Sequence, residues 1–338
     1  MGKETIKGRV CREYCERHPD LPNLTLARMV VANEPKMFGD VNSARLIIAY
    51  LRGRRKSGRG RKITNPVVTT IADNRVQFQY RAPQTHAEPL TEFVIHGAQR
   101  ILRLSDIHYP FHDERALTAA IEYGTKHDPA IVLLDGDVID CHDLSDYERD
   151  PRHRYTETEL GMIAGELAQL RQALPKARII WKSGNHEDRL KRYLMRRAPD
   201  LFGLPNMDVP GLVCMVGGAG AMERVEWIDS KRVIRCGHLA LLHGHEFGGG
   251  GGGVNPARWL FLRAGENAIC GHFHRTSEHS EPSLSRQQRG AWSTGCLCEM
   301  SPAYMPHNKW NHGFAWIEVE ASGNFRVKNI RIIDGAIR

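Results

Sequence analysis

The strongest constraint in this sequence is a set of short apolar segments that alternate with helical stretches. The apolar segments are residues 100–104, 130–134, 178–181, 239–242 and 267–270. The helical stretches between them lie near residues 114–127, 156–173, 187–197 and 256–264. This alternation is typical of βαβ units and a layered sheet. After residue 275 the helical pattern stops, and the sequence predicts antiparallel strands at 289–297, 312–319 and 324–333. We therefore expect an α/β protein with a mixed sheet.

Each of the five apolar segments runs directly into side chains that can bind a metal ion. They are Asp106 and His108 in SDIHYP, Asp137 in DGDVID, Asn185 and His186 in SGNHE, His243 and His245 in HGHE, and His272 and His274 in GHFH. Ligand sites of open α/β sheets lie at the carboxyl ends of the strands. An Asp-x-His or His-x-His pair points both side chains to one face, so both can reach a single centre. We expect these side chains to meet at one site.

The chemistry of this donor set favours a particular kind of metal centre. Oxygen and imidazole donors without a thiolate suit Mn, Fe or Zn better than a soft thiolate-binding metal. Seven donors, the set without His186 and His245, are too many for one tetrahedral ion, but they suit two ions that share a carboxylate. Two such ions can activate a bridging hydroxide and hold a phosphate through its transition state. The alternative is five unrelated groups of core or capping residues.

The motifs closely resemble those of the calcineurin-like metallophosphoesterase superfamily. Its pattern is D-x-H, G-D-x-x-D, G-N-H-[ED], a lone His before Gly, and G-H-x-H. In this sequence the five motifs begin at Asp106, Gly136, Gly184, His243 and Gly271, and the resemblance covers about residues 99–334. The longer stretches SDIHYPFHD, GDVIDCHDLSDYERDP and GNHEDRLKRYL look like the phage and prophage branch of the superfamily.

The resemblance implies a layered, mixed β-sheet sandwich flanked by helices, with two divalent metal ions. Mn²⁺ is the first choice of metal, and Fe, Zn or Ni are alternatives. By this resemblance Asp137 bridges the two ions and His186 faces the phosphate. The remaining ligands would be Asp106, His108 and His274 for the first ion, and Asn185, His243 and His272 for the second ion.

Three further residues are weaker candidates for the site. Arg189 lies one helical turn after Asn185 and could contact phosphate, or it could be a surface residue of the helix. His245 lies two residues beyond a proposed ligand on the same face and could contact substrate. Asp140 could orient a ligand histidine from behind.

The positive charge of the chain is concentrated at its start. Residues 1–62 hold 15 basic and 6 acidic side chains, whereas the remaining residues hold 32 and 33. Helices are predicted at about 5–18, 24–33 and 41–52, followed by the basic stretch RGRRKSGRGRK. Three short helices with a basic tail are similar to a helix-turn-helix unit that contacts DNA or RNA. The alternative is a small helical cap with a solvated tail.

We predict three parts of the chain: a basic helical, helix-turn-helix-like segment at 1–62, a connector with edge strands at 63–98, and the metallophosphoesterase domain at 99–338. β-rich pieces of the connector are expected at 75–80 and 91–96. No apolar run reaches the roughly 18 residues of a membrane helix, and nothing indicates secretion. We therefore expect a cytoplasmic protein, with its eight cysteines reduced and no membrane partner.

The function that best fits these features is a metal-dependent phosphodiesterase or nuclease, with residues 1–62 holding a nucleic acid. The alternative is a phosphomonoesterase or small-molecule phosphodiesterase whose basic segment has another purpose. A binding scaffold without turnover fits less well, because all seven metal donors and His186 are present.

Overall fold

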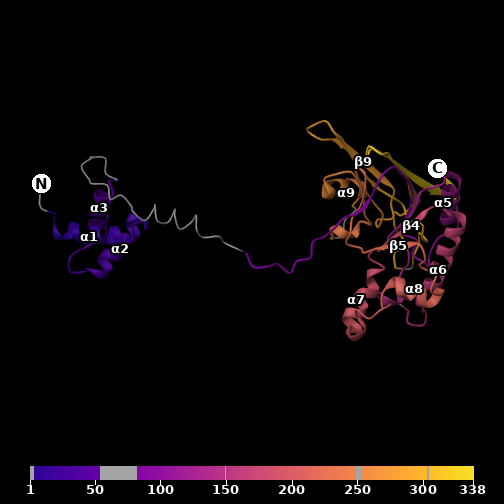
Figure 1. Cartoon of the computed structure of the whole chain (residues 1–338), viewed down its shortest axis with the longest axis horizontal. Helices are drawn as coiled ribbons and strands as arrows, with labels where there is room; N and C mark the ends of the chain where they lie inside the picture. The colour runs from indigo at the N-terminus through magenta and orange to yellow at the C-terminus, as the bar shows by residue number, and fades with distance from the viewer. Residues whose placement is uncertain (1–3, 54–81, 149, 249–252, 303) are drawn as a thin grey trace. The chain divides into compact units, whose positions relative to one another are not determined.

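The structure is a computed structural model of the chain, and it describes all residues except 1–3, 54–81, 149, 249–252 and 303. The chain forms two compact units, Met1–Ala87 and Glu88–Arg338 (Figure 1). Because residues 54–81 lie outside the described part, the predicted segment 1–62 and connector 63–98 stay a prediction. The same holds for the strand expected at 75–80.

The N-terminal unit contains the three predicted helices, α1 (Ile6–Arg17), α2 (Asn23–Asn33) and α3 (Val41–Leu51). Two of them begin at capping side chains: Thr5 accepts from the Gly8 N–H, and Asp40 accepts from the Ser43 N–H. All three helices contribute to one buried core. Its members are Cys11, Cys15, Leu26, Ala27, Val30, Phe38, Ala44, Ile48 and Leu51.

The first residue of the predicted basic tail has a structural role in this unit. The Arg52 guanidinium donates to the carbonyl oxygens of His18, Pro19 and Leu21 and to the side-chain oxygen of Asn23. These bonds tie the end of α3 to the turn between α1 and α2. Arg52 is therefore occupied within the unit, and the tail beyond residue 53 lies outside the described residues.

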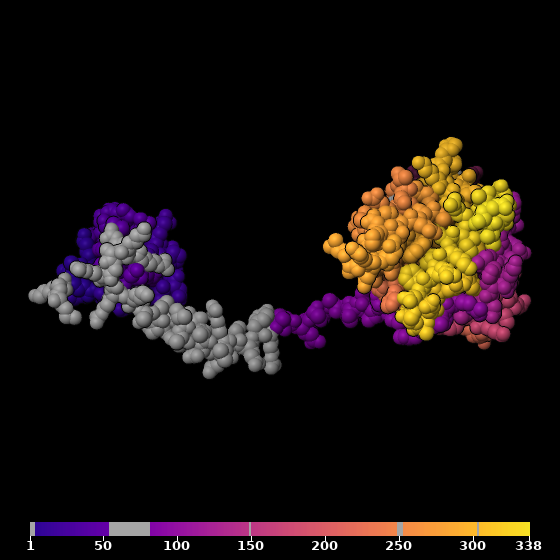
Figure 2. Space-filling model, turned by 90° about the horizontal axis from the view of Figure 1, so that it is seen from above, coloured from indigo at the N-terminus to yellow at the C-terminus, as the bar shows by residue number. Residues whose placement is uncertain are grey.

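The second unit is built on two mixed β-sheets. The seven-stranded sheet has the order β13-β12-β11-β2-β3-β4-β5, in which β2, β3, β4 and β5 are parallel. Its strands are β2 (Gln99–Leu104), β3 (Ile131–Asp135), β4 (Arg178–Lys182), β5 (Val225–Ile228), β11 (His312–Val319), β12 (Phe325–Ile333) and β13 (Ala336–Ile337). The C-terminal strands, yellow in Figure 2, lie at the surface of this unit.

The six-stranded sheet has the order β1-β6-β7-β8-β10-β9. Its strands are β1 (Phe93–Ile95), β6 (Ile234–Cys236), β7 (Leu239–Leu241), β8 (Ala268–Cys270), β9 (Ser277–Pro282) and β10 (Gln288–Ser293). The predicted strand 289–297 is present as β10, but it pairs in parallel with β8 and antiparallel only with β9. Strands β5, β6 and β9 were not predicted from the sequence.

Helices cover the outer face of each sheet, so the unit has four layers. A core beneath α5 (Glu114–His127), α6 (Thr156–Ala173) and α8 (Val209–Gly217) covers one face of the seven-stranded sheet. A second core, which includes Ile101, Leu133, Ile180 and Leu241, lies between the two sheets. The helix α9 (Pro256–Ala264) packs on the outer face of the six-stranded sheet (Figure 1). The structure thus has the predicted layered α/β sandwich, with an unpredicted helix, α8.

Three adjacent strands each place a charged side chain between the sheets, close to their carboxyl ends. Strand alternation turns Ile101, Leu133 and Ile180 toward the inner core, and two residues later the same face carries Arg103, Asp135 and Lys182. Arg103 bonds Asp135 at 2.6 Å, and both side chains are fully buried. The guanidinium also donates to Thr294 and to the Leu242 carbonyl, which belong to the six-stranded sheet side.

No helix among the described residues is both long enough and apolar enough to cross a membrane. All eight cysteines are free thiols, as the sequence predicted.

We predict that Arg103→Met destabilises the fold by about 3–5 kcal/mol, because it leaves the Asp135 carboxylate buried without its partner. Urea unfolding would measure this free energy. The matched control is Arg178→Met, which breaks the exposed Arg178–Glu226 pair and should cost less than about 1 kcal/mol. Equal losses in the two variants would contradict a structural role for the buried pair.

Candidate active site

The predicted site residues come together at the carboxyl ends of β2, β3, β4, β7 and β8. The backbone there is unusual, because five non-glycine residues have φ between 51° and 65°, namely Asp106, His108, Asp137, His272 and His274. The left-handed region is unfavourable for residues with a Cβ atom, and such strain concentrates at functional sites. All five are among the metal ligands predicted from the sequence.

Two glycines let the loops approach one another closely. A Cβ atom on Gly136, whose φ is +82°, would lie 2.4 Å from the His243 ring. A Cβ atom on Gly184 would lie 2.3 Å from a carboxylate oxygen of Asp137. The motifs G-D and G-N therefore require glycine because the neighbouring ligand side chains occupy that space.

The first predicted group of ligands converges on one point. The Nε2 atom of His274 is 3.2 Å from Oδ1 of Asp106 and 3.3 Å from Nε2 of His108. The Nε2 atom of His108 is 3.9 Å from Oδ2 of Asp137. Two imidazole nitrogens and two carboxylates thus face the same small space.

The second predicted group lies on the other side of Asp137. The ligand atoms of Asp137, His243 and His272 all lie within 4.8 Å of one another, and Nε2 of His243 is 3.0 Å from Oδ2 of Asp137. The side-chain oxygen of Asn185 is buried without a hydrogen bond among the described residues. Asp137 therefore stands between the two groups, where a bridging ligand would be needed.

The outer nitrogen of two ligand histidines is fixed by an acceptor behind it. Nδ1 of His243 lies 2.9 Å from the Asp135 carbonyl, and Nδ1 of His108 lies 2.9 Å from the Asp140 carboxylate. Because these oxygens accept hydrogen bonds, Nδ1 carries a proton, and Nε2 is the nitrogen that faces the other predicted ligands. The prediction that Asp140 orients a ligand histidine agrees with this contact.

The residues present fit a divalent metal centre on electrostatic grounds. Asp106 and Asp137 are almost completely buried. Burial opposes their charge, but the nearby histidines lower the pKa of both carboxyl groups below its usual value. Burial also disfavours charge on His243 and His274, yet Asp137 and Asp106 raise the pKa of each ring to about 10. Protons on these rings thus neutralise the buried carboxylates, and bound cations would replace those protons.

His186 and Arg189 form a pair at the edge of this centre. His186 bonds the Asp140 carbonyl through Nδ1 at 3.0 Å, and its Nε2 lies 3.0 Å from an Arg189 nitrogen. Arg189 also donates to the Asp140 carbonyl at 2.8 Å. Burial lowers the pKa of His186, and the nearby His108 lowers it further. Arg189, in α7 (Asp188–Arg197), is thus only 15% exposed and lies beside His186, whereas its contact with phosphate stays a prediction.

His245 lies beside the second group of ligands. Its ring is 5.3 Å from that of His243 and 6.3 Å from that of His272. Its Nδ1 atom is buried without a hydrogen bond among the described residues. Contact between His245 and substrate stays a prediction.

Two glutamates that hold the loops were not singled out from the sequence. The Glu187 carboxylate accepts from the N–H groups of Gly184, Asp137, Val138 and Ile139, at 2.7 to 3.3 Å. It thereby joins the loops after β3 and β4.

Glu246 has the corresponding role in the loop after β7. Its carboxylate accepts from the N–H groups of His243 and Gly244, and it pairs with buried Lys182 at 2.8 Å. The sequence feature that could have indicated this pair is Lys182, a lysine at the end of an apolar strand.

A third glutamate supports the loop that follows Asp140. Glu159 of α6 is 1% exposed and accepts from the Cys141 N–H at 2.8 Å. Burial, and to a smaller extent the charge of Asp140, raises the pKa of Glu159 to about 8.

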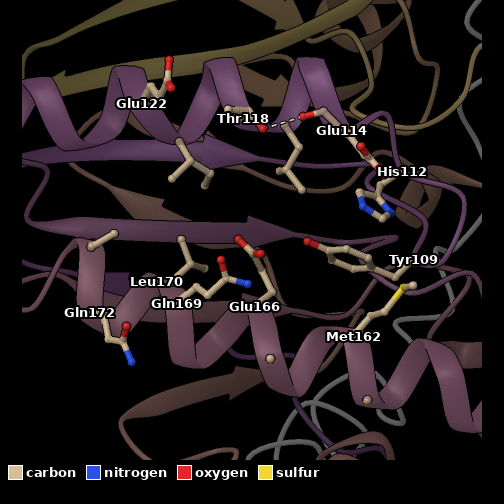
Figure 3. Close-up of a pocket in the computed structure, with 15 residues that line it drawn as sticks. Tyr109, His112, Glu114, Thr118, Glu122, Met162, Glu166, Gln169, Leu170 and Gln172 are labelled. Carbon is tan, nitrogen blue, oxygen red and sulfur yellow. Dashed lines mark hydrogen bonds between the residues drawn. The ribbon is translucent and has the colours of Figure 1, made fainter.

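A cavity of about 960 Å³ between α5 and α6 lies next to the site but does not contain it. Tyr109 follows the predicted ligand His108, and its hydroxyl points into this cavity toward Glu166 (Figure 3). No predicted metal ligand lines the cavity. We therefore place the catalytic centre at the strand ends.

Comparison with known proteins gives the family. The Metallophos family model, described as calcineurin-like phosphoesterase, matches residues 99–276, just over half of the chain. A comparison with curated proteins gave no match. The chain therefore belongs to the calcineurin-like phosphoesterase family, and it is a metal-dependent phosphoric ester hydrolase. Membership in the phage and prophage branch stays a prediction.

Several solved structures are similar to this chain at low identity. Vps29 from Entamoeba histolytica has 13% identity and a TM-score of 0.37, over 71% of this chain and 96% of that chain. Vacuolar protein sorting 29 from Cryptosporidium parvum has 13% identity and a TM-score of 0.39, over 72% and 95%. The phosphoesterase Yfce from E. coli has 15% identity and a TM-score of 0.32, over 68% and 98%. Similarities of this size support no inference about activity.

We predict that Glu159→Gln becomes more stable relative to the wild type as pH rises from about 4.5 to 8. In this window the folded wild type holds a proton that the unfolded chain has released, so its stability falls with pH by up to about 1.4 kcal/mol per unit. Glutamine does not titrate. Urea unfolding at several pH values would measure the difference, with Glu157→Gln, exposed on the same helix, as control. Parallel pH profiles for Glu159→Gln and the wild type would contradict the raised pKa.

Proposed function

We propose that this chain is a two-metal phosphodiesterase that cleaves nucleic acid. The observation that carries the proposal is the placement of Asp137 between two converging groups of buried donors. Mn²⁺ is the proposed metal, because the set contains carboxylate, amide and imidazole donors. When bound, two such ions would supply a water of lowered pKa and a clamp for the phosphate oxygens. The seven ligands would be Asp106, His108, Asp137, Asn185, His243, His272 and His274.

The chain's own residues would bind and orient the phosphate beside this centre. Arg189 is 15% exposed, and its guanidinium is held by two bonds to Asp140 and His186. A planar guanidinium fixed in this way can donate to two phosphate oxygens with little further loss of side-chain freedom. His245 would contact the substrate from the side of the second ion.

His186 would stabilise or protonate the leaving oxygen. Burial lowers the pKa of His186, so its ring is neutral near pH 7 and its Nε2 accepts a hydrogen bond from Arg189. A phosphate dianion or diester next to the ring would favour its protonated form. The ring could then give this proton to the leaving oxygen. The backbone N–H of His186 separately donates to Asp137 at 2.9 Å, a contact that does not depend on the ring.

The nucleic-acid part of the proposal is supported by charge. The basic excess of the chain lies in residues 1–62. In the described part of that segment, Lys7, Arg9, Arg28 and Arg45 are exposed on a three-helix unit with its own core. Such a unit could hold phosphates while the second unit cleaves them. A cytoplasmic location belongs to the same proposal.

We predict that Asp137→Asn and His186→Gln lose activity for different reasons. Asp137→Asn should abolish Mn²⁺-dependent hydrolysis of bis-p-nitrophenyl phosphate and lower the bound metal, because it removes the shared carboxylate. His186→Gln should keep two ions yet lose about 10²–10⁴ in rate, the range for removal of a general acid. Metal analysis and kinetics on the same preparations would separate the two effects.

Two outcomes would contradict these roles. Full metal content in Asp137→Asn would exclude the bridging ligand. An equal rate loss in His186→Gln for p-nitrophenolate and alkoxide leaving groups would exclude a proton donor, because only the alkoxide needs a proton. Faster hydrolysis of p-nitrophenyl phosphate than of the diester would favour the phosphomonoesterase alternative.

We also predict that a chain starting at Glu88 cleaves small diesters normally but binds DNA less tightly. The plot of log affinity against log salt should flatten by about 0.9 for each phosphate of duplex DNA that the shortened chain no longer neutralises. Binding at several salt concentrations would measure this slope for the full and shortened chains. An active shortened chain with unchanged DNA affinity and slope would remove the proposed role of the N-terminal unit.

A further inference from the structure

A loop that follows β10 brings two aromatic side chains to the predicted metal centre. The N–H of Glu299 donates to the Phe111 carbonyl at 2.8 Å, and the N–H of Asn311 donates to the His274 carbonyl at 2.9 Å. These bonds fix both ends of the loop to the segments that carry His108 and His274. The aromatic residues in the loop are Tyr304 and Trp310.

Trp310 packs directly on a predicted metal ligand. Its ring lies 4.1 Å from the His274 ring, at an angle of 62°. Its backbone N–H donates to the Asn308 side chain at 2.9 Å, and the Asn308 amide donates to the Met305 carbonyl at 2.9 Å. These hydrogen bonds fix the backbone that carries Trp310 at the rim of the site.

Tyr304 extends this aromatic surface outward from the metal centre. Its ring lies 6.4 Å from that of Trp310, at an angle of 62°. The residue is 72% exposed, which is unusual for a large aromatic side chain beside a buried polar site. Partial burial, together with the charge of Asp140, raises the pKa of the Tyr304 hydroxyl. Most of Tyr304 thus stays open to solvent, next to the Trp310 ring.

We propose that Tyr304 and Trp310 form a subsite that stacks an unpaired nucleobase next to the scissile phosphate. This inference rests on the proposed phosphodiesterase function, and it narrows the substrate to diesters that carry a nucleoside. Any of the nucleobases can stack on an aromatic side chain, because every base has a π face. A base in a duplex is already stacked on its neighbours, so the subsite favours single strands and chain ends.

The subsite and Arg189 both lie beside the predicted centre, because Trp310 packs on His274 and Arg189 contacts His186. Arg189 donates to the Asp140 carbonyl at 2.8 Å and lies 3.4 Å from the Asp140 carboxylate. The phosphate would lie at Arg189 and the metal centre, with its base turned toward the exposed Tyr304 ring. The face of an aromatic ring makes no base-specific hydrogen bonds, so the subsite should accept purines and pyrimidines alike.

The test compares two diesters with the same leaving group and charge: the p-nitrophenyl ester of thymidine 5′-phosphate, and methyl p-nitrophenyl phosphate. Tyr304→Ala should lower kcat/KM for the thymidine ester by about 5- to 150-fold, mainly through KM, and leave the methyl ester unchanged. Tyr304→Phe should keep the wild-type value for both. Phe202→Ala is the matched control, because it removes an exposed aromatic side chain beyond the far end of α7.

The outcomes separate the subsite from the proposed function. An equal loss on both esters, or no loss on either, would overturn the subsite. Hydrolysis of neither ester by the wild type would overturn the diesterase function instead. Calorimetric titration with thymidine 5′-phosphate then tests the subsite without turnover: weaker binding to Tyr304→Ala supports it, and equal binding overturns it.

Discussion

Buried negative charge is the constraint on which the rest of this structure depends. Asp106, Asp135, Asp137, Asp140 and Glu187 are all at least nine-tenths buried within one region at the strand ends. Isolated carboxylates are too costly to bury, so each must meet a positive or hydrogen-bonding partner. Arg103 forms an ion pair with Asp135, and backbone N–H groups donate hydrogen bonds to Glu187. Imidazole rings contact Asp106 and Asp137. The last two carboxylates lack a permanent cation of their own, and this need defines a metal centre.

The same constraint explains how the loops of the site are held in place. Three strands end with Arg103, Asp135 and Lys182 on the face between the sheets, directly beneath the loops that carry the ligands. Through Leu242, Thr294 and Glu246 these side chains reach the loops and strands of the opposite sheet. Five predicted ligands have left-handed backbone, which is unfavourable. This conformation can persist because contacts from both sheets fix the loops that contain them. The loops that carry the predicted ligands are thus tied to both sheets.

In the proposed function, the two units have different tasks. The second unit would provide phosphate chemistry through Asp137, His186 and Arg189, and it would do so for any small diester. The basic helices of the N-terminal unit would select a polymer, and the aromatic pair Tyr304 and Trp310 would select a nucleoside. Coulombic attraction acts over roughly 10 Å in salt, whereas stacking needs contact, so the two features would act at successive stages of binding.

The sequence by itself determined the strand–helix alternation and the identity of the donors, because both depend on local patterns. Asp106, His108, Asn185 and His243 follow apolar strands, and parallel strands must bring their carboxyl ends together. Tertiary structure alone decided what has no local signal. From the sequence, Arg189 could be a surface residue or a site residue, and its contact with Asp140 is visible only in the structure. Glu159, Glu246 and Tyr304 are not among the donor residues that predicted the site, so no local pattern pointed to them. The sequence also did not predict that β10 pairs in parallel with β8. The direction of a strand relative to its neighbour depends on which neighbour it pairs with, and the strand's own residue pattern does not encode it.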